Sequence, residues 1–291
     1  MVYANPPWIF KGKALYQLQL VKSDEARKYI PDNFKLVELF GYTLGGFYLA
    51  RYDDSPAGTF DELVAMAGLV WNPPTSCAWA ARVYVNNKEA RDHGIHHVGL
   101  PSRLASFALT SGSGAQGQGQ QLEKRGGWWK ADGPKQQVLE LSNVDPRRGR
   151  GLSAPVCRIE LPWGERALGP RIKLPLPSFS GGTQEVPGLL QYACDLSTHV
   201  GLVAPLRVSV PAPGRGEEES PECLAAVLGG KPLVAIEFAA MEMRVEEPVA
   251  LTLAQPQAQQ QKGWASATQT ASLTTAWGAR SWGARRPAVA C

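Results

Sequence analysis

Glu62 is the residue of this chain best suited to acid–base chemistry. It begins the apolar run from Glu62 to Trp71 and directly follows Phe60-Asp61. A carboxyl group that faces an apolar interior has its charged form disfavoured, so its pKa rises and the group can act as an acid or a base near neutral pH. The same position also suits a glutamate at the exposed end of a strand, and the local sequence leaves both interpretations open.

Histidines and cysteines are the residues that could bind a metal. His93, His96 and His97 lie close together, but zinc needs further ligands of matched geometry, and imidazoles exposed at a helix end explain the cluster equally well. The five cysteines are odd in number and widely spaced, with no C-x-x-C pair, so we expect reduced and mostly buried thiols. The sequence therefore predicts no metal and no cofactor.

Two motifs are similar to nucleotide or nucleic-acid sites. The glycines Gly112, Gly114 and Gly117 have the spacing of a dinucleotide fingerprint, but the Gln- and Gly-rich residues after them cannot form the required helix. A repeated Trp-Gly-Ala-Arg at 277–280 and 282–285 could stack on single-stranded nucleic acid, although low complexity explains it as well. We expect no nucleic-acid partner.

Charge and hydropathy narrow the function classes further. The chain has 291 residues, 44% of them hydrophobic, and a formal net charge of +4 that resides entirely in residues 251–291. Residues 1–250 are electrically balanced, so no long-range field would steer the protein to polyanions. No run approaches the length of a membrane span, and no leader pattern is visible at the start. We expect a soluble intracellular protein, cytoplasmic by default.

Strands must position Glu62, because the apolar runs have strand length and strand periodicity. Glycines 41, 45 and 46 interrupt one such run, which is typical of bulges and close backbone approach in a strongly curved sheet or a closed barrel. The fold class is therefore α+β with mainly antiparallel strands. The runs that predict strands lie at 16–20, 35–51, 62–71, 77–85, 157–161, 206–210, 233–238 and 241–246.

Helices and uneven composition complete the organisation. Capping residues predict short helices from Ser23 to Ile30 and from Asn87 to His93, the second ending at Gly94 in a left-handed cap. One domain spans residues 1–250 and contains a low-complexity insertion at 111–137. Residues 251–291 form a Gln- and Ala-rich basic tail that we expect to be disordered.

Several longer motifs resemble the plant and algal neoxanthin-deficient protein family, which is similar in fold to acetoacetate decarboxylase. The resemblance covers about residues 6–109 and 156–250. It implies a closed, cone-like antiparallel barrel with short flanking helices. The matching segments are 6–12, 14–18, 40–47, 50–58, 71–83, 176–181 and 237–243.

The resemblance also implies a set of site residues. In the decarboxylase a buried lysine forms a Schiff base, a neighbouring cation lowers its pKa, and a glutamate and an arginine complete the pocket. The resemblance places Ser102 at the nucleophilic lysine and Arg103 at the neighbouring cation. Glu62 falls on the pocket glutamate, and Lys13 on the arginine. Serine cannot form an imine, so Schiff-base decarboxylation is not expected. The predicted ligand-binding set is Lys13, Glu62, Ser102 and Arg103.

Two functions follow from this set. The first is an accessory or ligand-binding protein required for the biosynthesis of neoxanthin, a xanthophyll, which does not itself convert violaxanthin. Its ligand would be small and either apolar or carboxylate-bearing. The second is a lysine-independent enzyme in which Glu62 is the acid or base acting on a keto acid or an epoxide. The pathway makes the chloroplast a second candidate compartment, although no transit peptide is visible.

Overall fold

The computed structural model describes residues 5–72, 75–111, 137–144, 152–162, 169–211 and 221–251. The fingerprint glycines, nearly all of the predicted insertion and nearly all of the predicted tail lie outside these residues. Their interpretation therefore stays a prediction. None of the helices within the described ranges is long and apolar enough to cross a membrane.

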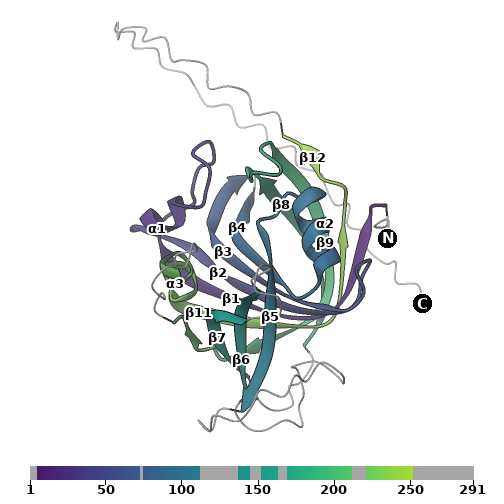
Figure 1. Ribbon diagram of the computed structural model, residues 1–291. Coiled ribbons are helices and arrows are strands. Elements are labelled where there is room, and N and C mark those ends of the chain that lie inside the picture. The colour runs from purple at the N-terminus through teal and green to yellow at the C-terminus, as the bar shows by residue number, and fades with distance from the viewer. Residues whose placement is uncertain are drawn as a thin grey trace, which may run out of the picture. The chain divides into compact units, whose positions relative to one another are not determined.

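A curled, mainly antiparallel sheet dominates the structure (Figure 1). Seven strands follow one another around the curl, and each pairs with the next in antiparallel fashion. In spatial order they are β4 (Thr75–Val85), β3 (Phe60–Asn72), β2 (Tyr42–Asp54), β1 (Trp8–Lys22), β11 (Lys231–Val245), β9 (Leu189–Val203) and β8 (Arg171–Gly181).

The first and last of these strands, β4 and β8, come close to each other. The ring of Phe34 bridges them, with its centroid 5.2 Å from that of Trp79 on β4 and 4.9 Å from that of Phe179 on β8. Within the described ranges, no backbone pairing joins β4 to β8. The predicted antiparallel sheet is confirmed, whereas full closure of the barrel stays a prediction.

A second group of strands leaves β4 and folds over the sheet. The pairing from β4 to β5 is parallel, and the pairings beyond it are antiparallel. These strands are β5 (Ser102–Ser111), β6 (Gln137–Val144), β7 (Leu152–Leu161) and β10 (Val208–Ser209), while the short β12 (Val249–Ala250) pairs with β9. The helices are α1 (Ser23–Arg27), α2 (Lys88–His96) and α3 (Pro221–Leu228).

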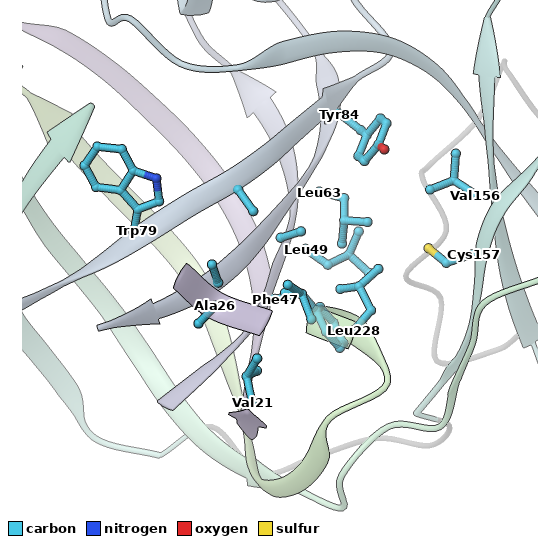
Figure 2. Packing of buried hydrophobic residues seen from close by; sticks show 14 of the residues in the cluster. Val21, Ala26, Phe47, Leu49, Leu63, Trp79, Tyr84, Val156, Cys157 and Leu228 are labelled. Atoms are coloured by element: carbon cyan, nitrogen blue, oxygen red, sulfur yellow. The ribbon is translucent and has the colours of Figure 1, made fainter. Parts of the chain in front are cut away.

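The sheet carries a hydrophobic cluster on each face. On the outer face, Phe47 of β2 and Leu63 of β3 belong to a cluster with Cys157 of β7 and Leu228 of α3 (Figure 2). On the inner face, apolar residues from β1, β2, β3, β4, β9 and β11 form a second cluster around the interior of the curl. Because both faces are buried, the central strands are nearly continuous apolar runs in the sequence.

Two buried glutamines attach peripheral segments to the outer face of β1. The Gln17 side chain accepts a hydrogen bond from the Leu206 amide at 2.6 Å and donates to the Leu206 carbonyl at 3.1 Å. The Gln19 amide donates to the carbonyls of Val227 and Leu228, both at 3.0 Å, at the end of α3. Gln17 also donates to Gln19 at 3.1 Å, so the pair satisfies polar groups that would otherwise be buried without partners.

Two local predictions need correction. Gly94 does not end the second helix but lies inside α2, where an added Cβ would lie 2.6 Å from Ser102 Oγ, so the glycine permits close packing. The segment 35–41 is not part of β2, which begins only at Tyr42. By contrast, the strand glycines do mark close approach: a Cβ on Gly46 would lie 1.9 Å from the Gln17 carbonyl oxygen.

Replacing Gln17 with alanine should lower the free energy of unfolding by about 1–3 kcal/mol, because both polar groups of Leu206 would lose their buried partner. Urea denaturation measures the change. The matched control is Gln191→Ala, at a partly exposed position of β9, which should change stability by less than about 0.5 kcal/mol. Equal effects of the two variants would contradict the structural role given to Gln17.

Candidate functional site

Strand pairing directs Glu62 to the inner face of the sheet. Glu62 lies opposite Ala50 on β2 and opposite Val85 on β4, and both neighbours belong to the inner cluster. Paired residues of neighbouring strands share a face, so the Glu62 side chain points into the interior of the curl. The interpretation of Glu62 as an exposed strand-end glutamate is therefore wrong.

Tyrosines surround the Glu62 carboxyl group. The Tyr52 hydroxyl donates a hydrogen bond to Glu62 Oε2 at 2.9 Å. Tyr48, two residues earlier on the same face of β2, hydrogen-bonds with Tyr52, and its hydroxyl also lies 3.1 Å from Met241 Sδ. Burial raises the pKa of Glu62 to about 7, and the hydrogen bond from Tyr52 offsets part of this rise. Glu62 can therefore give up or take up a proton near neutral pH.

The other polar groups near Glu62 are neutral at physiological pH. Burial raises the pKa of Tyr16 to about 12 and that of Cys194 to about 12, and it raises the pKa of Tyr48 and Tyr192 further still. No described lysine or arginine contributes to the shifted pKa of Glu62. Well below pH 7, Glu62 is neutral as well as these tyrosines and Cys194.

The side chains beside Glu62 are only partly buried. Tyr16, Tyr48, Glu62 and Tyr192 keep part of their surface accessible, although burial in the protein is the main cause of each shifted pKa. Their accessible surface leaves this part of the inner face open to contact with a small molecule. A space lined by aromatic groups with a few converging polar groups has the character of a small-molecule site.

The structure does not bring Lys13 to this site. Lys13 lies opposite Arg51, one residue along from the inner-facing pair of Ala14 and Ala50, so it projects from the outer face. There the Arg51 guanidinium binds the buried Asp61 carboxylate, with Nη1 2.9 Å from Oδ2. Burial, together with the neighbouring Arg51 charge, lowers the pKa of Lys13 against the opposing effect of Asp53.

Ser102 and Arg103 are likewise separated by strand alternation. Ser102 pairs with Val83 of the inner cluster and is buried, whereas Arg103 pairs with Tyr84 of the outer cluster and is exposed. The prediction of one pocket containing Lys13, Glu62, Ser102 and Arg103 is therefore corrected. Glu62 and Ser102 share the inner face, and the two cations are on the other side of the sheet.

Helix α2 covers part of the interior through a buried histidine. His93 is buried, and its ring meets the edge of Trp8 at 4.3 Å between centroids and stacks on His97 at 5.0 Å. Burial lowers the pKa of His93 to about 3, so its imidazole is neutral and serves in packing. The expectation of exposed imidazoles at this helix end is wrong for His93.

Tyr48 and Tyr52 are the neighbours of Glu62 that the sequence did not lead us to expect. Their signal was present in the alternation Tyr48-x-Ala50-x-Tyr52 on β2 and Phe60-x-Glu62 on β3. Once Glu62 faces inward, antiparallel pairing requires Tyr52 and Tyr48 to share its side of the sheet.

Known proteins with similar sequences come from plants. Protein NEOXANTHIN-DEFICIENT 1 of Arabidopsis thaliana is 44% identical over 274 residues, which are 86% of this chain and 95% of that protein. The chain belongs to the NEOXANTHIN-DEFICIENT 1 family. The proteins of the same name from Oryza sativa subsp. japonica and Solanum lycopersicum are each 42% identical and cover 84% and 86% of the chain, and 88% and 94% of their own lengths. No protein-family model matches the chain.

Solved structures place the family member in the acetoacetate decarboxylase fold. The acetoacetate decarboxylase of Legionella pneumophila aligns with a TM-score of 0.57 at 11% identity, covering 87% of this chain and 90% of that one. The enduracididine biosynthesis enzyme MppR, complexed with pyruvate, aligns with a TM-score of 0.54 at 13% identity over 86% and 91% of the two chains. At such identities the likeness concerns the fold alone.

Ionisation of Glu62 should make the protein less stable as pH rises. The folded pKa of about 7 exceeds the ordinary value of 4.5, so the folded state binds the proton more tightly. The stability that the folded protein has while Glu62 is protonated is fully present below pH 4.5, and it is lost as pH rises through about 7. Relative to Glu62→Gln, the wild type should lose roughly 3 kcal/mol between pH 4 and pH 8 in urea denaturation.

The control for this experiment is Glu242→Gln, because Glu242 is exposed on β11. Its unfolding free energy should follow the wild-type dependence on pH. A wild type and a Glu62→Gln variant with parallel profiles would show that Glu62 titrates at an ordinary pKa, and the buried acid would then be refuted.

Proposed function

We propose that this family member is an accessory, ligand-binding protein of neoxanthin biosynthesis that holds a xanthophyll end group in the interior of its sheet beside Glu62. The names of its plant relatives support the pathway. The observation that carries the site is the protonatable Glu62, hydrogen-bonded by Tyr52 at 2.9 Å among neutral tyrosines.

The charge of the interior selects the chemical class of the ligand. A carboxylate ligand would need a cation to offset its desolvation, yet Lys13 and Arg103 project from the opposite face. A neutral hydroxyl or epoxide oxygen needs only a hydrogen-bond donor, which protonated Glu62 provides. Of the two ligand classes expected from the sequence, the apolar, oxygen-bearing one is therefore favoured.

An enzymatic role is the second candidate, and the pKa of Glu62 favours it. An acid with a pKa of about 7 can protonate an epoxide oxygen as the C–O bond opens. The carboxylate left behind can then accept the proton that the substrate loses from carbon, so an isomerisation conserves protons and needs no co-reactant. Schiff-base chemistry has no support, because the resemblance places Ser102 at the position of the nucleophilic lysine, and Arg103 faces outward.

Complementation tests the accessory role. In an Arabidopsis thaliana line that lacks its NEOXANTHIN-DEFICIENT 1 protein, the wild-type chain should restore neoxanthin, measured in pigment extracts by chromatography. Glu62→Leu should restore less than about half, because leucine offers no hydrogen-bond donor to the ligand oxygen. Glu242→Leu is the matched control, since Glu242 is exposed on β11, and it should behave as wild type. Failure of the wild-type chain to change the neoxanthin content would refute the proposed pathway role.

Turnover separates the two candidates. Purified protein incubated with violaxanthin in detergent micelles should bind the pigment without producing neoxanthin. If product forms, and forms at least about tenfold more slowly with Glu62→Gln, the accessory role is wrong and the acid–base enzyme replaces it. Product formation that is equal in wild type and Glu62→Gln would point to a contaminant and support neither mechanism.

A further inference from the structure

The two leucines of β8 that face the interior are exposed, although their partners are buried. Leu174 and Leu176 are 39% and 37% exposed, whereas Leu196 and Cys194, opposite them on β9, are 3% and 8% exposed. By strand alternation all four lie on the inner face. The interior is therefore accessible along the first half of β8.

Prolines explain why this edge of the sheet stays open. Pro175 and Pro177 alternate with the leucines and lack the N–H groups that a neighbouring strand would need. Both prolines lie within the pairing to β9, so the free edge of β8 cannot form regular backbone bonds at these positions. β4 and β8 approach each other near Trp79 and Phe179, beyond this stretch.

The inner face of β8 changes from apolar to polar toward Glu62. Leu174, Leu176 and Ser178 follow one another at two-residue steps, and Ser178 hydrogen-bonds with Tyr192, which lies opposite it on β9. Burial is the main cause that raises the pKa of Tyr192 and of Cys194, and the charge of Glu62 adds to it in both cases, so the acid lies close to this end of the strip. At about 3.3 Å per residue, the strip from Leu174 to Ser178 is about 13 Å long.

We propose that β8 forms the mouth of the interior and that it admits an elongated, apolar molecule with its oxygenated end first. The leucines contact the hydrocarbon chain, while Ser178, Tyr192 and Glu62 receive the oxygenated end. This inference rests on the proposed function, because it requires a ligand site beside Glu62. It adds the route of access and the need for a long apolar tail.

Two probes of different length test the mouth. All-trans-retinol has a ring, a polyene chain and a neutral hydroxyl, and its fluorescence increases on binding. The short probe 2,2,6-trimethylcyclohexanol has only a ring and a hydroxyl, and calorimetry measures its binding. The double variant Leu174→Lys/Leu176→Lys should raise the Kd of retinol at least tenfold and leave the Kd of the short probe unchanged. Leu39→Lys is the matched control, since Leu39 is 69% exposed outside the sheet, and it should change neither Kd.

Three results would overturn the inference. A retinol Kd within twofold of wild type in the double variant overturns the mouth at β8, and so does an equal loss of both probes. If neither probe binds the wild type, the proposed function fails and the inference fails with it. Thermal unfolding verifies that the double variant is folded; if it is not, Leu174→Ser/Leu176→Ser replaces it, with the same two probes and the same expected outcomes.

Discussion

The register between β2 and β3 is the constraint on which the chemistry of this protein depends. It pairs Arg51 with Asp61 and, one residue along, Ala50 with Glu62. Because strand residues alternate between faces, one pair forms an ion pair on the outer side while the neighbouring acid points into the interior. A slip of β3 by one residue would turn Glu62 to the outer face and bury Asp61 inside the curl. Asn86 also holds Asp61 in this register. The Asp61 backbone N–H donates to Asn86 Oδ1, and the Asn86 side-chain amide donates to the Asp61 carboxylate.

The same alternation explains how paired charges on the outer face and an acid without a cationic partner on the inner face coexist in one sheet. On the outer face, charges offset one another: Arg51 neutralises Asp61, and the carboxylates of Asp53 and Glu237 act on Lys13 against the cost of burial. On the inner face, no described cation offsets Glu62, so burial acts on its pKa with only the Tyr52 hydrogen bond opposing it. The pKa of Glu62 can stay near neutral pH because Arg51, the arginine of β2, lies on the opposite face of the sheet.

The sequence predicted the strands better than it predicted the site. Alternation and apolar runs located β1 to β4 because both faces of these strands are buried, and the resemblance identified the family. The pocket was wrong in part because adjacency in sequence, as for Ser102 and Arg103, means opposite faces in a strand. Helix α3 was missed because it is short and its carbonyls depend on Gln19, which is more than 200 residues away in the chain. Such long-range partners leave no periodic signal in a single sequence.

The fold is shared with decarboxylases, but its interior here suits different chemistry. Imine formation needs an amine with a lowered pKa, and among the residues that the structure describes the lysine with a lowered pKa, Lys13, lies on the outer face. What faces inward is an acid that is half protonated near pH 7 and a ring of tyrosines that remain neutral. Desolvation in that setting penalises a charged ligand and leaves a neutral oxygen unpenalised once it accepts one hydrogen bond. The open edge at β8 adds room for an apolar tail, so discrimination would rest on the length and neutrality of the ligand rather than on its charge.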